Sequence, residues 1–128
     1  MSQSQVDGNG TWYYWTPTLS NVNSLMFGYN SNSVPSEVRI NGDVVAFTVG
    51  NNGPATAFGS NSWCIPTVPA DGNITEVAFT SDTGTSGTGV AGFLLNGNTT
   101  NDLVFNNRGT DYDLMQDSPT HNYSTLNP

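Results

Sequence analysis

The stretch EVRINGDVVAFTV, residues 37–49, decides the fold class of this chain. Two runs rich in β-branched and apolar residues flank Asn41-Gly42. An Asn-Gly pair between such runs is the strongest short signal for a β-hairpin, because both central residues of the tight turn need positive φ. Val38 and Ile40 alternate with charged residues, so one face of the first strand is expected to be buried and the other solvated. We therefore predict a hairpin whose two strands are the runs on either side of the turn.

Short apolar runs separated by Gly, Asn, Asp and Ser continue through the rest of the chain, and no window has a sustained helical period. Residues 63–68 are broken by Pro66, which predicts an edge strand or an irregular segment there. Asp71-Gly72 predicts a further turn. The other strands are expected at residues 11–16, 23–29, 74–80, 90–95, 103–105 and 112–115.

About eight strands at a spacing of roughly 8–12 residues indicate an all-β protein, an antiparallel β-sandwich or jelly-roll-like barrel. The 128 residues fit one domain. We expect residues 1–10 to form a flexible N-terminal arm, residues 11–116 a single sandwich domain, and residues 117–128 an extended C-terminal tail.

The charge balance excludes several classes of partner. Only 9% of the residues are charged, Lys is absent, and Arg39 and Arg108 oppose ten acidic residues, which gives a net charge of −8. A chain with two cations cannot neutralise a phosphate backbone, so we expect no nucleic-acid partner. The same charge disfavours anionic membrane surfaces. Residues 1–9 are polar and lack the apolar core of a secretion signal.

Residues for common catalytic chemistry are scarce. His121 is the single His and falls in the predicted tail, while Cys64 is the single Cys and is expected to be a buried apolar residue. We therefore expect no enzyme and no cofactor, and a glycosidase that uses carboxylates alone is the open alternative. Asp111, Asp113 and Asp117 could approach a cation, but a solvated acidic face is the favoured interpretation and no metal site is predicted.

The aromatic block Trp12-Tyr13-Tyr14-Trp15 is the main candidate contact site. In a strand, Trp12 and Tyr14 point to one face while Tyr13 and Trp15 point to the other. The block could form a subunit interface, a stacking platform for sugar rings, or a strand buried on both faces. Trp63 is a further candidate for contact with a glycan.

The C-terminal segment DSPTHNYSTLNP, residues 117–128, resembles a short linker of bacteriophage tail-fibre and other virion surface proteins. Residues 102–109, DLVFNNRG, are similar to a second pattern of such modules, with Phe105 and Asn107 in place of its Trp and Lys. The resemblance implies a virion structural protein and no catalytic residues. It also makes the tail residues Asn122, Tyr123 and Leu126 candidates for binding a partner.

The function expected from this resemblance is that of a phage virion protein assembled in the host cytoplasm: a capsid decoration protein, head fibre or tail-fibre module. Its expected partners are further copies of itself, in a trimer, other virion proteins and a host surface glycan. The alternative is a carbohydrate-binding module or lectin that stacks sugars on exposed aromatic side chains.

Overall fold

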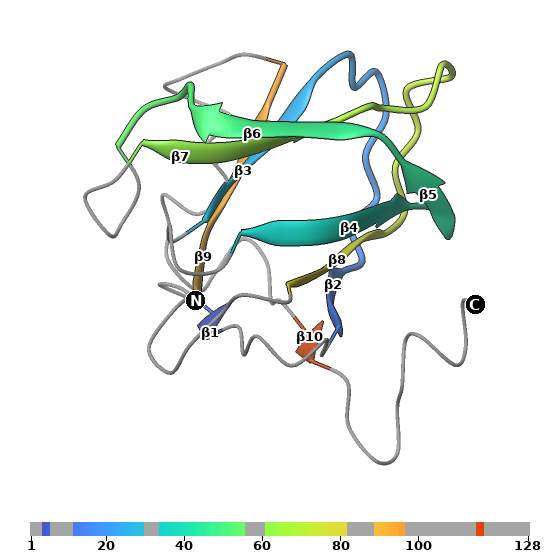
Figure 1. Cartoon of the computed structure of the whole chain (residues 1–128). Helices are drawn as coiled ribbons and strands as arrows, with labels where there is room; N and C mark the ends of the chain where they lie inside the picture. The colour runs from blue at the N-terminus through green and yellow to red at the C-terminus, as the bar shows by residue number, and fades with distance from the viewer. Residues whose placement is uncertain are drawn as a thin grey trace.

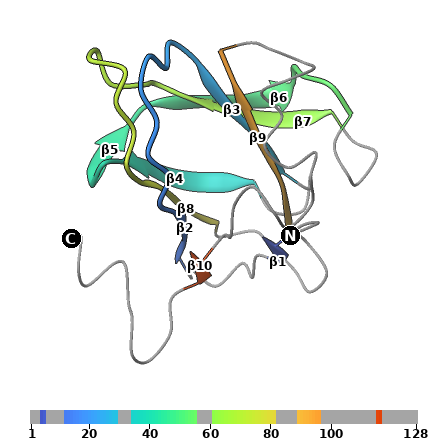
Figure 2. The same cartoon turned by 180° about the vertical axis from the view of Figure 1, so that it is seen from behind.

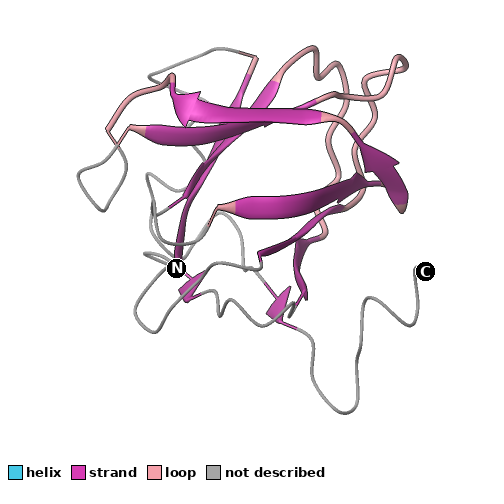
Figure 3. Cartoon of the chain, viewed as in Figure 1, coloured by secondary structure: helices cyan, strands magenta, loops and turns pink. Residues whose placement is uncertain are grey.

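The described residues form two antiparallel sheets of five strands each (Figure 1). The computed structural model describes residues 4–5, 12–29, 34–55, 61–81, 89–96 and 115–116. These residues contain strands and loops and no helix (Figure 3), which confirms the all-β prediction. The strands are β1 (Ser4–Gln5), β2 (Trp12–Trp15), β3 (Leu25–Tyr29), β4 (Pro35–Ile40), β5 (Asp43–Val45), β6 (Phe47–Asn51), β7 (Ser62–Pro66), β8 (Val77–Ser81), β9 (Gly89–Leu95) and β10 (Met115–Gln116).

The order of the strands is that of a jelly roll. Sheet A has the order β1-β9-β3-β7-β6 and sheet B the order β10-β2-β8-β4-β5. The pairs β1·β9, β2·β8, β3·β7 and β4·β5 are nested, as in one long antiparallel hairpin wrapped around a core. The hairpin closes at Asn41 and Gly42, with φ of 53° and 87°, so the predicted turn is confirmed. β6 and β10 extend this framework of eight strands at its edges.

The predicted second strand of the hairpin is two strands. β5 lies in sheet B and β6 in sheet A, so the chain changes sheets at Ala46 (Figure 1). The backbone N–H and the hydroxyl of Thr67 both donate to the Ala46 carbonyl, at 2.8 and 2.9 Å. These bonds hold the chain where it passes from sheet B to sheet A. The run is apolar there and contains no Gly or Pro, so the sequence gives no sign of the change of sheets.

β7 is not the edge strand that Pro66 predicted. It lies between β3 and β6, and β6 takes the edge. Pro66 is tolerated because it ends β7 and pairs only with Phe47 of β6, whereas β3 pairs with β7 at Cys64 and Trp63. A proline in that place removes no hydrogen bond from the ladder to β3.

Aromatic rings from the two sheets meet in the core. Trp15 of sheet B stacks on Phe93 of sheet A with ring centroids 4.2 Å apart, and Phe27 of sheet A stacks on Phe79 of sheet B at 4.9 Å. Such pairs add stability beyond the area that they bury. The main core comprises Tyr13, Trp15, Val22, Leu25, Phe27, Tyr29, Val38, Ile40, Trp63, Cys64, Ile74, Val77, Phe79, Phe93 and Leu94.

Two loops close one end of the sandwich. Residues 16–24 and 67–76 cross between the sheets in opposite directions and lie side by side in both views (Figures 1 and 2). Leu19 and Ile74 exchange backbone hydrogen bonds of 3.0 Å, and the Val22 N–H donates to the Gly72 carbonyl. Gly72 has φ of 74°, as the predicted Asp71-Gly72 turn requires.

Two short strands, β1 and β10, lie at the expected terminal segments. Ser4–Gln5, inside the expected arm, pairs with β9, and Met115–Gln116, at the end of the expected domain, pairs with β2. The expected strand at residues 103–105 and the expected tail lie outside the described residues.

Candidate interaction surface

The aromatic strand β2 is buried on both faces. Tyr13 and Trp15 belong to the main core, and Trp12 and Tyr14 form a second buried cluster with Ala78 on the other face of sheet B. The exposed fractions of Trp12 and Tyr14 are 7% and 3%. Of the interpretations left open for this block, the burial supports a strand packed on both sides, because within this chain neither ring has a free face for a sugar.

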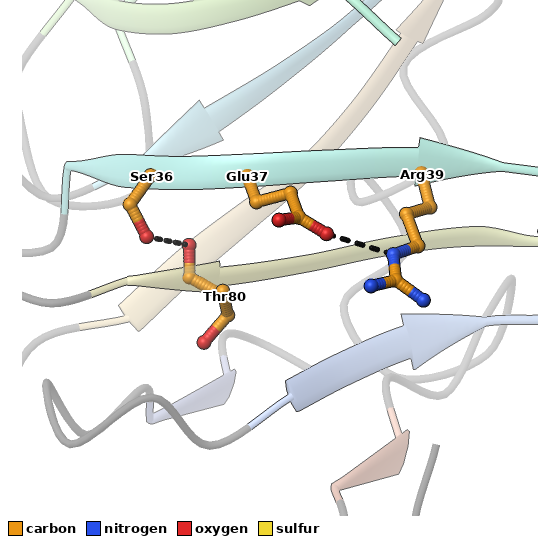
Figure 4. Close-up of polar contacts among 4 residues, drawn as sticks. All are labelled: Ser36, Glu37, Arg39 and Thr80. Atoms are coloured by element: carbon orange, nitrogen blue, oxygen red, sulfur yellow. Dashed lines mark hydrogen bonds and ion pairs between the residues drawn. The ribbon is translucent and has the colours of Figure 1, made fainter. Parts of the chain in front are cut away.

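Arg39 accompanies the second cluster. Its guanidinium carbon lies 4.7 Å from the centroid of the Trp12 ring, and its Nε donates to the Glu37 carboxylate at 2.7 Å (Figure 4). The neighbouring Ser36 hydroxyl donates to the Thr80 carbonyl at 3.3 Å. The predicted solvated face of β4 is thus only half-exposed, because its cation is used within the protein to cover an aromatic ring.

Trp63, the other candidate glycan contact, is covered by a loop. Its neighbour Cys64 pairs with Phe27, so the Trp63 side chain leaves β7 on the other side from that of Cys64, although both residues belong to the main core cluster. The indole Nε1 donates to the carbonyl of Pro54 at 2.5 Å. A Cβ built on Gly53 would lie 2.5 Å from the ring, so the backbone there is packed directly on the indole. Trp63 is fully buried and offers no stacking surface.

The described residues bring together no cluster of potential metal ligands. Among them, no group of three or more His, Cys, Asp and Glu side chains is close enough to share a metal ion. Cys64 is buried, and burial raises the pKa of its thiol, which keeps it in the unreactive neutral form. No helix in the described part of the chain could cross a membrane. Asp111, Asp113, Asp117, His121 and the tail candidates Asn122, Tyr123 and Leu126 lie outside the described residues.

The edge formed by β5 and β6 differs from the rest of the described surface because it exposes large hydrophobic side chains. One continuous stretch of chain supplies the last described strand of both sheets on this side of the sandwich. Val44 and Val49, which are 66% and 42% exposed, are the large hydrophobic residues that the described surface leaves exposed. Residues 44–51 carry no charge. Along residues 44–51 this edge therefore lacks the charged residues and Pro that commonly block edge-to-edge pairing.

The register shows which backbone groups of β6 point outward. The Thr67 N–H donates to the Ala46 carbonyl, and Pro66, which pairs with Phe47, has no N–H. Hydrogen-bonded and non-hydrogen-bonded pairs alternate along an antiparallel ladder. Thr48 and Gly50 therefore bond to β7, whereas the N–H and C=O groups of Phe47, Val49 and Asn51 point away from it.

The sequence contained part of this signal. Residues 43–49 predict a strand, but the division of this run between two sheets, which makes both halves edge strands, follows only from the topology. Charges or Pro within residues 44–51 would indicate a protected edge, and none occurs there. No known protein family, curated protein or solved structure matches the chain.

Proposed function

We propose that this chain is a structural protein of a bacteriophage particle, namely a capsid decoration protein, head fibre or tail-fibre module that acts by assembly and surface binding. The observation that carries the proposal is the nested jelly-roll topology. Jelly rolls form viral capsid domains, lectins and cupins. A fold alone does not fix a function, so the choice among these classes depends on the residues.

Three properties favour a structural role. The described residues bring together no metal-binding cluster, and the single thiol is buried. The core contains stacked rings from both sheets, which suits a particle component that must stay folded outside a cell. The segments 102–109 and 117–128 resemble phage fibre proteins. Assembly with further copies and with other virion proteins, and contact with a host surface glycan, belong to this proposal.

The lectin alternative is less well supported by this structure. Jelly rolls do include lectins. However, Trp12, Tyr14 and Trp63, on which sugar stacking was expected, are all buried within the chain. A sugar site in the described residues would have to rely on polar side chains, loops or the partly buried Phe47 of β6. Such a site would differ from the usual one, in which an exposed aromatic ring carries much of the binding.

Immunogold electron microscopy tests the proposed function. Antibodies raised against the purified chain would be applied to particles isolated from a lysate of cells that carry its gene. We expect label at a defined position on the heads or tails, and the chain in the protein profile of the particles. Recovery of the chain only in the particle-free fraction would reject the virion role. Binding of the purified chain to a defined sugar on a glycan array, without any label on particles, would favour the lectin.

A further inference from the structure

We infer that β6 of one chain pairs antiparallel with β6 of a second copy around a two-fold axis at Val49. This inference rests on the proposed assembly function, because it names the first partner in that assembly. The edge strand has a row of outward-pointing backbone groups and no described neighbour on that side. Such a row is a template for another strand.

The backbone of β6 fits a second copy of itself. The residues with outward N–H and C=O groups are Phe47, Val49 and Asn51, spaced evenly around Val49. An antiparallel partner centred there places Val49 opposite Val49, and Phe47 opposite Asn51 on each side. Each of these three pairs exchanges two hydrogen bonds, so the contact contains about six bonds. The two copies of sheet A would thereby become one continuous sheet.

The side chains agree with this register. Val49 lies opposite the core residue Cys64 and hence on the core-facing side of β6, yet it stays 42% exposed because the described sheet ends there. Across the two-fold axis it would meet the Val49 of the partner, and cross-strand pairs of β-branched residues stabilise a sheet. Thr48 would face Gly50, a combination without steric conflict. The contact therefore covers an apolar side chain that the single chain exposes.

Charge distribution favours a copy of this chain as the occupant. Each chain carries a net charge of −8, so most contacts between two copies would bring acids together. Residues 44–51 are uncharged, and the nearest acid along the chain, Asp43, lies in β5 of the other sheet rather than in the β6 ladder. Two acidic chains can therefore meet at this edge without opposed carboxylates.

The symmetry of the contact is defined by its geometry. A strand that pairs with its own copy makes an isologous contact, which closes as a dimer. A trimer, expected from the resemblance to fibre proteins, needs a heterologous contact between two different patches. The β6 pairing therefore predicts a dimer as the unit that this edge builds, and leaves β5, the edge of sheet B, outside the contact.

Substitutions at Val49 test the pairing, with molar mass measured by light scattering on a sizing column. The wild-type chain is expected at twice its mass of 13.6 kDa. Val49→Lys places two lysines opposite each other and is expected to weaken the dimer at least about tenfold, since like charges directly opposite destabilise a strand pair. The matched control Val44→Lys makes the same change at the exposed valine of β5 and should leave the dimer intact.

Two further variants separate pairing from folding. Val49→Pro removes an N–H that points away from β7, so the fold, followed by circular dichroism, is retained while the dimer weakens. Val49→Asp alone should also be monomeric, and mixing it with Val49→Lys should restore a dimer through opposite charges.

The outcomes distinguish this inference from the proposed function. A monomeric or trimeric wild-type chain at about 100 µM, or a dimer that Val49→Lys and Val44→Lys weaken equally, overturns the β6 pairing whatever the particle-labelling experiment shows. A dimer with the expected Val49 dependence, from a chain that never labels particles, supports the pairing and rejects the virion role.

Discussion

The indole Nε1 of Trp63 donates a hydrogen bond to the Pro54 carbonyl at 2.5 Å, and this bond fixes the loop after β6 over the outer side of β7. The Asn61 side chain donates to the Gly53 carbonyl at 2.7 Å from the other end of the same loop. The result is a fully buried tryptophan whose ring packs directly against the loop after β6. The loop takes the place that a ligand would need.

Gly53→Ala is expected to lower the free energy of unfolding by about 1–3 kcal/mol. The added methyl would lie 2.5 Å from the Trp63 ring, a distance at which the loop or the indole must move. Urea unfolding monitored by tryptophan fluorescence measures the change. Gly50→Ala is the matched control, because its Cβ would meet nothing closer than 3.9 Å. Equal losses in the two variants would show that the loop does not pack on Trp63 in this way.

Arg39→Lys is expected to destabilise the protein although it preserves the charge. The planar guanidinium lies over the Trp12 ring and also bonds to Glu37, and a Lys ammonium cannot reproduce that stacked geometry. The expected loss is about 0.5–2 kcal/mol in the free energy of unfolding. Near-ultraviolet circular dichroism should also change, because the surroundings of Trp12 change.

Glu37→Gln separates the ion pair from the stacking. The side chain of Glu37 is 37% exposed, so its pair with Arg39 is screened by solvent. We expect a loss below that of Arg39→Lys and no change in the near-ultraviolet spectrum. A larger loss in Glu37→Gln would mean that the ion pair, rather than the stacking on Trp12, is the main contribution of Arg39.

Asn41→Gly tests the closed end of the sandwich. The side-chain Oδ1 of Asn41 accepts from the Thr75 N–H at 2.8 Å and from the Glu76 N–H at 3.2 Å, and its side-chain Nδ2 donates to the Asn73 carbonyl at 2.9 Å. Glycine keeps the positive φ of the turn but loses these bonds, so stability should fall by about 1–2 kcal/mol in thermal or urea unfolding.

Asn41→Asp is the comparison at the same position, because it keeps an oxygen acceptor and loses the donor to Asn73. A smaller loss than in Asn41→Gly is expected. If Asn41→Gly is as stable as the wild type, the turn conformation alone explains the asparagine.

Local chemistry was sufficient to predict the hairpin, and the topology was not predictable in the same way. The turn at Asn41-Gly42 depends only on the positive φ angles of these two residues. The alternation of Val38 and Ile40 depends only on one face of the strand being buried. The change of sheet at Ala46 depends on Thr67, which is distant in sequence. The position of β7 inside sheet A depends on where β3 stops pairing, which no residue near Pro66 indicates.

The burial of the candidate contact residues could not be decided from the sequence for a related reason. Strand alternation divides the aromatic block between two faces and leaves open whether the second face is exposed or covered. The contact of Arg39 with the Trp12 ring and the burial of that face depend on tertiary structure. The edge at Val49 is not predictable from the sequence, because β6 is an edge strand only by virtue of having no further described strand beside it. Short-range patterns identify strands more readily than they identify which strand ends a sheet.

The buried thiol of Cys64 predicts a loss of stability at alkaline pH. Burial raises the pKa of this thiol in the folded protein, whereas in the unfolded chain it titrates near ~8.5. Above that pH the unfolded state loses a proton that the folded state keeps, so the free energy of unfolding falls as the pH rises, by about 1.4 kcal/mol per pH unit. Burial also raises the pKa of Tyr29, which adds to the fall above about pH 10.

Urea unfolding between about pH 7 and 10 measures this slope, and Cys64→Ala is the reference. The variant is less stable at neutral pH because it leaves a cavity, but its stability should be flat up to about pH 9.5, where tyrosines begin to ionise in the unfolded chain. A thiol reagent at pH 8 should modify the wild-type chain only as fast as it unfolds. Parallel pH profiles for the two proteins, or rapid modification of the folded chain, would show that Cys64 is accessible and its thiol not held neutral by burial.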